Sequence, residues 1–146
     1  MAGTYEISSD PQRLDIPLIH SWLSEQSYWS RGIPRDIVER AVANSLNFAV
    51  YHAADGQVGF ARVVTDRATF AYLADVFVLE AHRGKGLSKR LMEAVIAHPE
   101  LQGLRRWLLA THDAHGLYER FGFTHLKVAN RLMERVDSDI YSRMKV

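Results

Sequence analysis

Cysteine is absent from this chain of 146 residues. Disulfides, thiolate zinc sites and cysteine nucleophiles are therefore excluded. An excess of one charge is also lacking, because 18 basic residues stand against 17 acidic ones and give a formal net charge of +1. A protein that holds nucleic acid through a broad basic surface normally has a larger positive excess. We therefore expect no nucleic-acid partner.

Long apolar runs are missing as well. No stretch approaches the roughly 18 apolar residues of a membrane-spanning helix, and residues 1–30 lack the basic start and apolar centre of a secretion signal. We expect a cytoplasmic protein without a membrane partner. Hydrophobic residues make up 47% of the chain, which is enough for a core. Its length is typical of one domain, so residues 1–146 are expected to form a single domain.

The first third of the sequence predicts one strand and two helices. Weak alternation in residues 4–8 favours a strand. Residues 14–26 carry an apolar stripe at helical spacing, with Asp15 as the cap and Pro17 in the first turn. Residues 34–45 begin with proline and repeat apolar residues at helical spacing, which predicts a second helix.

The rest of the sequence predicts an antiparallel meander and then a mixture of helices and strands. Two β-type segments flank the turn ADG, and a longer one follows the turn at 66–68. Together with the first strand, this order favours an α+β domain built around one mixed, mostly antiparallel sheet. In chain order, the predicted elements are strands at 47–53, 57–65 and 69–79, a helix at 86–98, a strand at 107–110, a helix at 114–123 and one or two strands at 124–136.

The stretch HRGKGLSKRLM (82–92) joins the longest predicted strand to a helix. Gly84 and Gly86 remove side chains that would keep an anion away from the backbone. The first amides of the helix have no intrahelical acceptor, and the helix dipole is positive at this end. Arg83 and Lys85 add positive charge at the rim. The stretch therefore predicts a site for a phosphate-type anion.

Two other glycine motifs for phosphate do not fit this loop. A P-loop requires Lys followed by Ser or Thr after the last glycine, and that pair is missing. A dinucleotide fingerprint requires a third glycine where this chain has Lys89, and it normally opens a parallel strand–helix–strand unit. Arg83, Gly86 and Ser88 instead fit the pattern Arg-x-x-Gly-x-small. A nucleotide phosphate remains an alternative ligand of the loop.

Two motifs together resemble the GNAT superfamily of N-acetyltransferases. VFVLEAHRGKGLSKRLM is similar to that family's pyrophosphate motif, R/Q-x-x-G-x-G/A, with Ser88 where the family prefers glycine or alanine. ATHDAHGLYERFGF resembles its second motif, A-x-x-x-Y-x-x-x-G-F, at Ala114, Tyr118, Gly122 and Phe123. The predicted element order also matches over nearly the whole chain. The resemblance implies the GNAT-like fold, with helices on both faces of the sheet.

The resemblance also implies acetyl-CoA as co-substrate and direct transfer of its acetyl group to a primary amine. The pantetheine arm would lie along the strand at 69–79, which a bulge splays from the strand at 107–110. Tyr118 would protonate the departing thiolate, and Asp75 is the candidate base. The residues expected to contact acetyl-CoA are Val76, Phe77, Val78, Arg83, Gly84, Lys85, Gly86, Leu87, Ser88 and Thr111.

The same chemistry follows from the reaction itself. An amine that attacks a thioester must lose a proton, and the developing oxyanion needs a fixed donor, for which strand amides near Phe77 or Val78 would serve. Because the chain lacks cysteine, direct attack is simpler than a covalent enzyme intermediate.

Several of these residues have a purely structural alternative. Tyr118 fits a core tyrosine, and Asp75 fits a structural hydrogen-bond acceptor. The loop with Tyr28, Trp29 and Arg31 either covers the acceptor pocket or packs on the sheet. His112 and His115 flank Asp113, and this histidine pair has the spacing of metal ligands. A third protein ligand at suitable spacing is missing, so no metal is expected.

The sequence leaves the acceptor and the assembly open. A small-molecule or peptide amine is the expected acceptor. An acyl-CoA-binding sensor or interaction module without transferase activity is the alternative function. NRLMERV (130–136) is suited to forming the edge of a homodimer.

Overall fold

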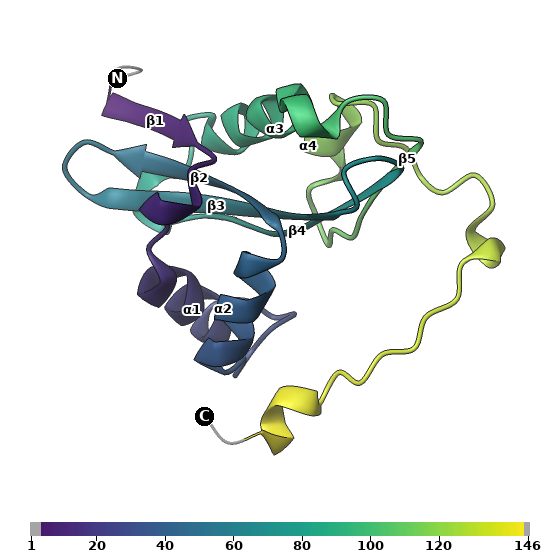
Figure 1. Ribbon diagram of the computed structural model, residues 1–146, viewed down its shortest axis with the longest axis horizontal. Helices are drawn as coiled ribbons and strands as arrows, with labels where there is room; N and C mark the ends of the chain where they lie inside the picture. The colour runs from purple at the N-terminus through teal and green to yellow at the C-terminus, as the bar shows by residue number, and fades with distance from the viewer. Residues whose placement is uncertain (1–3, 145–146) are drawn as a thin grey trace.

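A five-stranded sheet forms the centre of the computed structural model, which describes residues 4–144 (Figure 1). The strands follow one another in the sheet in chain order. The first four strands pair antiparallel, each with the next, and the fifth is parallel to the fourth. The predicted mixed, mostly antiparallel sheet is confirmed. The strands are β1 (Tyr5–Ser8), β2 (Leu46–His52), β3 (Gly56–Thr65), β4 (Phe70–Val78) and β5 (Arg106–Leu109).

Helices cover both faces of this sheet, as the resemblance implied (Figure 1). On one face, α1 (Ile16–Glu25) and α2 (Arg35–Ala43) pack on Phe60 and Phe77 through one apolar cluster. On the other, α3 (Leu87–Ala97) and the short α4 (His115–Glu119) enclose the second cluster. The two clusters hold the helices at fixed positions against the sheet. Within residues 4–144, no helix has the length and apolar character needed to span a bilayer.

The predicted start of α1 is confirmed. The Asp15 carboxylate accepts the amide of Leu18 at 3.1 Å, and Pro17 lies in the first turn, where no donor is required. The Asp15 amide donates to the side-chain oxygen of Gln57 at 2.7 Å. The cap therefore also ties α1 to β3.

The helix predicted at 114–123 is shorter than expected. It ends at Glu119, and the chain then turns through Gly122, which has a φ of +91°. The amides of Gly122 and Phe123 donate to the carbonyls of Glu119 and Tyr118 at 3.1 and 3.3 Å. This left-handed turn ends the helix and brings the Phe123 ring against Tyr118, with 6.1 Å between ring centroids.

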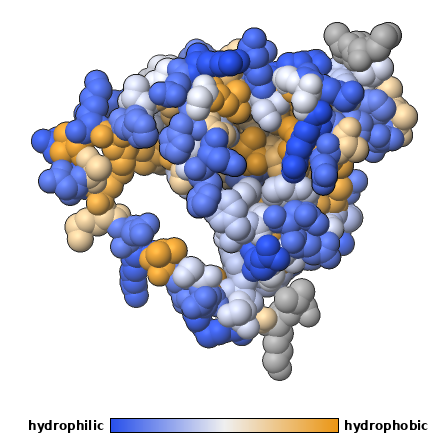
Figure 2. All heavy atoms as spheres, turned by 180° about the vertical axis from the view of Figure 1, so that it is seen from behind, coloured by the Kyte–Doolittle hydropathy of each residue, from blue (hydrophilic) through white to orange (hydrophobic). Residues whose placement is uncertain are grey.

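The prediction of strands at 124–136 is wrong. Within the described chain, residues 124–144 contain only two short 3-10 helices, Ala129–Arg131 and Ile140–Arg143. Figures 1 and 2 show this segment, the C-terminal arm, running away from the sheet with open space between it and the body. A strand needs a neighbouring strand for its backbone and an apolar surface for its side chains. The arm has neither in this chain, although Tyr141 at its end packs on the α1/α2 cluster.

Candidate active site

The glycine loop adopts the backbone conformation that an anion site requires. Gly84 and Gly86 have φ values of +78° and +74°, which side chains other than glycine rarely adopt. Gly86 caps α3, no side chain hydrogen-bonds to the first turn, and that turn contains no acidic residue. Most helices place a capping side chain or a carboxylate there. The first amides of α3 are therefore available to an anion.

A cavity of about 330 Å³ opens beside this loop. Three cations contribute to its wall, namely Arg83, Lys89 and Arg120. The Arg83 Nε atom also donates to the carbonyl oxygen of Val78 at 2.9 Å, which fixes the side chain at the end of β4. The full lining comprises Val78, His82, Arg83, Gly84, Gly86, Leu87, Ser88, Lys89, Leu117 and Arg120.

The cavity agrees only in part with the predicted contact residues. Lys85 and Thr111 are outside its lining, whereas Lys89 and Arg120 belong to it. Lys89 was not among the predicted contact residues. Arg120 was not singled out, because its distance from the glycine loop in sequence gave no reason to place it there. Its position two residues after Tyr118 in the second motif is the signal that could have found it.

β4 and β5 separate next to this cavity. Their parallel pairing runs only from Phe70 opposite Arg106 to Leu73 opposite Leu109. β4 continues to Val78, so residues 74–78 lie beyond the end of β5. Backbone groups on that side of β4 are thus left for another extended chain to pair with. The separation that the resemblance implied is confirmed.

A β-bulge in β4 produces this geometry. Phe60 pairs with Phe77, but Arg62 pairs with Ala74, so β4 has one residue more than β3 in this interval. Asp75 lies in the bulge with a φ of +55°. Without the bulge, the Asp75 side chain would point to the same face of the sheet as Leu73, into the apolar cluster under α3. Because of the bulge, it points to the other face, which α1 and α2 cover, and contacts Arg62. The sequence carries a signal for this change, because the core positions of the strand switch from odd to even numbers across Asp75.

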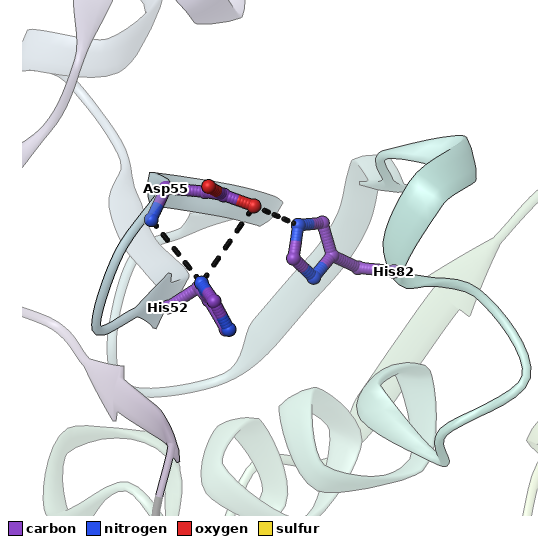
Figure 3. A group of neighbouring side chains, drawn as sticks. All are labelled: His52, Asp55 and His82. Carbon is purple, nitrogen blue, oxygen red and sulfur yellow. Dashed lines mark hydrogen bonds and ion pairs between the residues drawn. The ribbon is translucent and has the colours of Figure 1, made fainter.

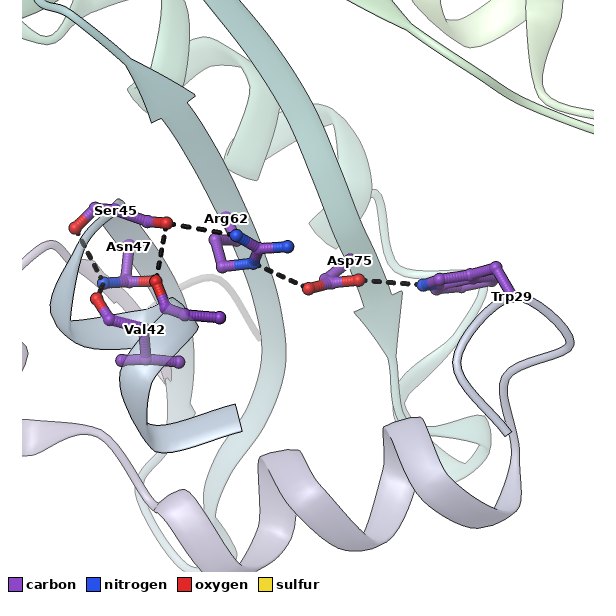
Figure 4. Close-up of polar contacts among 7 residues, drawn as sticks. Trp29, Val42, Ser45, Asn47, Arg62 and Asp75 are labelled. Atoms are coloured by element: carbon purple, nitrogen blue, oxygen red, sulfur yellow. Dashed lines mark hydrogen bonds and ion pairs between the residues drawn. The ribbon is translucent and has the colours of Figure 1, made fainter. Parts of the chain in front are cut away.

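The Asp75 carboxylate lies between two donors (Figure 4). The Nε atom of Arg62 donates to Oδ2 at 2.7 Å, and the indole nitrogen of Trp29 donates to Oδ1 at 2.8 Å. Arg62 also donates to the Ser45 hydroxyl at 3.1 Å. The predicted residues Asp75 and Trp29 are therefore in direct contact. Arg62 was not among the predicted site residues, although a charge within an apolar strand is a usable signal.

Aromatic rings surround this carboxylate. Trp29 and Tyr28 are 42% and 62% exposed, and the Tyr28 ring lies 5.1 Å from the His112 ring. Beneath them Trp22 stacks on Phe77 with 4.3 Å between centroids. The exposed rings are thus carried by the α1–α2 loop over the bulge. Arg31 is separate from this group, since its guanidinium contacts the carbonyl oxygen of Glu25.

Tyr118 is 7% exposed and packs in the cluster that contains Val78 and Leu87. Burial raises the pKa of its phenol, so the protonated form is favoured. Within residues 4–144 its hydroxyl has no hydrogen-bond partner. Thr111 accepts the amide of Ala114 at 3.0 Å and so holds the start of α4, which carries Tyr118.

Comparisons with known proteins agree with this arrangement. Residues 44–125, which include the glycine loop and Tyr118, match a family model described as an acetyltransferase (GNAT) domain. A provisionally named acetyltransferase from Gibberella zeae is 32% identical over 137 residues, with 80% of this chain and 76% of that protein covered. A solved structure of a provisionally named GNAT acetyltransferase from Xanthomonas campestris pv. campestris is 55% identical, with a TM-score of 0.90 and 94% and 96% coverage. A second solved structure, of a provisionally named acetyltransferase from Deinococcus radiodurans R1, shares the fold: it is 16% identical, with a TM-score of 0.75 and coverage of 100% of this chain and 97% of that one.

Proposed function

This chain belongs to the GNAT family of acetyltransferases, and from that premise we propose that it transfers the acetyl group of acetyl-CoA to a primary amine. The proposed route is direct attack in a ternary complex. The observation that carries the proposal is the position of the glycine loop beside the end of β4 that β5 leaves unpaired. One site can thus take both an anion and an extended chain with amide groups.

The fit of acetyl-CoA rests on these two features. Its pyrophosphate would accept hydrogen bonds from the loop and the first amides of α3, with Arg83, Lys89 and Arg120 supplying charge. Its pantetheine amides would pair with the backbone of Val76, Phe77 and Val78 as an added strand. Lys85 would lie at the outer rim of this proposed pyrophosphate site. Thr111 would contact the arm through the start of α4.

The chemical step needs groups that this site contains. The amine nitrogen attacks the thioester carbonyl carbon, and a β4 amide near Phe77 or Val78 stabilises the oxyanion. The carbon–sulfur bond then breaks, and the leaving thiolate takes the phenol proton of Tyr118. The raised pKa of this phenol keeps the proton in place until the thiolate forms. The proton that the amine loses passes to a base.

Asp75 is the proposed base. Its carboxylate lies at the bulge, and exposed Trp29 is the donor that an incoming amine would replace at Oδ1. The ion pair with Arg62 holds the other carboxylate oxygen, Oδ2, in place. The competing role in the same geometry is positioning, in which Asp75 holds Trp29 and the α1–α2 loop over the acceptor.

The proposed acceptor is a small-molecule or peptide amine that contacts Tyr28 and Trp29. Exposed aromatic rings next to a carboxylate suit an amine attached to an apolar or flat group. Arg31 would contact it only at the outer side of the loop. The balanced net charge of +1 supports neither nucleic acid nor an anionic membrane as the partner. The cytoplasm, which contains acetyl-CoA, is the proposed compartment.

Release of CoA thiol tests this proposal directly. Because the chain contains no cysteine, a thiol-reactive dye reports only the CoA that is set free. The purified chain is mixed with acetyl-CoA and a panel of small-molecule and peptide amines, and we expect release that depends on one class of amine.

The same assay distinguishes the two roles of Asp75. Asp75→Asn removes the acidic limb of the pH–rate profile if Asp75 is the base. It raises KM without changing that limb if Asp75 is a positioning residue.

The two rival functions give different results. An acyl-CoA sensor binds acetyl-CoA but releases no thiol with any amine. A nucleotide-phosphate site is indicated if ATP, and not acetyl-CoA, raises the melting temperature, since a ligand stabilises the state that it binds.

A further inference from the structure

Three side chains that the sequence did not bring together meet behind the glycine loop (Figure 3). His52 ends β2, Asp55 lies in the β2–β3 turn, and His82 ends the 3-10 helix that precedes Arg83. Asp55 Oδ2 lies 2.9 Å from His82 Nε2 and 3.7 Å from His52 Nδ1. All three candidate ligand atoms lie within 4.8 Å of one another.

The hydrogen bonds around His52 make its Nδ1 atom an acceptor, and an ion bound there would replace the two amide donors at its lone pair. The amides of Ala54 and Asp55 donate to His52 Nδ1 at 3.2 and 3.1 Å, so this nitrogen carries no proton. The nearby Asp55 oxygen is also an acceptor when ionised. Two acceptors 3.7 Å apart attract each other only through a shared cation. The centre of the group therefore favours a positive ion.

The surroundings of His82 are those of a supported metal ligand. The side chain is 9% exposed, and its Nδ1 atom lies 2.7 Å from the Tyr5 hydroxyl on β1. A histidine that binds metal through one nitrogen usually has the other held by a hydrogen bond, which fixes the ring. A tyrosine hydroxyl can donate or accept. Tyr5 can therefore hold His82 both with and without an ion.

We propose that His52, Asp55 and His82 bind one divalent transition-metal ion of the zinc type. Tetrahedral zinc with nitrogen and oxygen bonds of about 2.0–2.2 Å places its ligand atoms about 3.3 Å apart. The two separations that involve Asp55, 2.9 and 3.7 Å, lie on either side of that value, and the two imidazole nitrogens lie within 4.8 Å of each other. Two imidazoles select zinc-type ions over magnesium or calcium.

The ion takes the place of the proton between His82 and Asp55. His82 Nε2 then binds the ion, and His82 Nδ1–H donates to the Tyr5 hydroxyl. The Asp55 side chain is 58% exposed, so water reaches the fourth position. Because His82 directly precedes Arg83, the bound ion joins the β2–β3 turn to the start of the glycine loop. The site is structural, and it steadies the loop from behind.

Calorimetric titration with zinc chloride tests this site. The protein is the full chain without a polyhistidine tag, because a tag would bind zinc itself. We expect one equivalent to bind, and at least a tenfold higher Kd in His52→Ala and in Asp55→Asn. Both residues lie at the hairpin end rather than in the core, so these variants should keep their circular dichroism spectrum. Magnesium chloride should give no binding heat, and cobalt chloride should give the visible absorption of a four-coordinate ion.

A matched control comes from a second histidine pair, at the start of α4 and in the segment that follows it. His115 and His125 also form a close pair, with 5.4 Å between ring centroids, but no carboxylate joins them in the described group. The double variant His115→Ala/His125→Ala should bind zinc as tightly as the native chain. Loss of binding in that control, unchanged Kd in both His52→Ala and Asp55→Asn, or no stoichiometric binding by the native chain would each overturn the proposal.

Discussion

Asp75 holds a φ of +55° inside a strand, where residues other than glycine rarely adopt such an angle. Conformations of this kind cost about 1–3 kcal/mol and persist where surrounding contacts fix them. The ion pair with Arg62 and the hydrogen bond from Trp29 are such contacts. A single backbone angle therefore places a carboxylate on the face of the sheet that carries the α1–α2 loop.

Tyr118→Phe should lower kcat by about 100- to 10,000-fold, the usual contribution of a general acid. The Kd of acetyl-CoA should stay unchanged, because the substitution removes only the hydroxyl. The measurements are steady-state kinetics and calorimetry with acetyl-CoA. An unchanged kcat on the true acceptor would exclude the leaving-group role.

The pH dependence of stability gives a second readout of this phenol. Burial raises the pKa of Tyr118, so the folded state disfavours the phenolate. The contribution of this phenol to the free energy of unfolding should therefore be constant below the ordinary tyrosine pKa of about 10 and fall as pH rises above it. The Phe variant should lose part of that fall. Tyr51→Phe is the matched control, because burial also raises the pKa of Tyr51. The Tyr51 ring packs on Arg13, so the kcat of this variant should stay native.

The junction of β4 and α3 is the element that defines the donor site. Gly84 and Gly86 give the loop its left-handed turns, and α3 presents an N-terminus without a side-chain cap. The separation of β5 beyond Leu109 leaves room for an extended ligand beside the same junction. Neither half of this element would be sufficient alone, since a bare helix end binds any small anion.

Gly86→Ala should raise the Kd of acetyl-CoA by about tenfold or more. The added methyl group disfavours the left-handed backbone by about 1–2 kcal/mol, and a tenfold change in Kd corresponds to about 1.4 kcal/mol. Calorimetry with acetyl-CoA measures the effect. Gly103→Ala is the control, because Gly103 has a φ of +73°, also has open space around an added methyl group, and lies in the loop before β5. An equal rise of Kd in both variants would mean that the effect is general loss of stability.

For the molecule as a whole, the C-terminal arm is the feature that one chain does not explain. Its apolar side chains remain exposed, with Met133 at 96% and Val136 at 71%. Large exposed apolar groups gathered on one segment usually mark an interaction surface. β5 forms an outer edge of the sheet, and its outer backbone groups are open to another strand. We propose that the arm pairs with a second copy of this chain, as the edge predicted at 130–136 suggested.

The native chain should therefore be a dimer in size-exclusion chromatography with light scattering. Val128→Glu/Val136→Glu should give a monomer, because charges replace two exposed apolar side chains of the arm. Lys127→Gln/Arg135→Gln changes the net charge by the same −2 at the adjacent positions without removing an apolar side chain, so it should stay dimeric. A monomeric native chain, or a control that also dissociates, would contradict this assembly.

The sequence by itself determined the elements whose signals are local. Asp15 marked the start of α1, the turn ADG marked the β2–β3 hairpin, and Gly84 and Gly86 marked the anion loop. Each depends on a backbone conformation or a hydrogen bond that neighbouring residues set. The two motifs also identified the family, since their spacing reflects a ligand that contacts the chain at fixed positions.

Only the tertiary structure decided which distant side chains meet. Arg62 on β3 and Trp29 in the α1–α2 loop both donate hydrogen bonds to Asp75. Arg120, at the end of α4, lines the cavity beside the glycine loop. His52 and His82 meet because β2 and β4 run in the same direction on either side of β3 and end at the same end of the sheet, which no spacing in the sequence encodes. The arm at 124–144 contains no strand although strands were expected in 124–136, because an apolar segment becomes a strand only where a partner edge accepts its backbone hydrogen bonds.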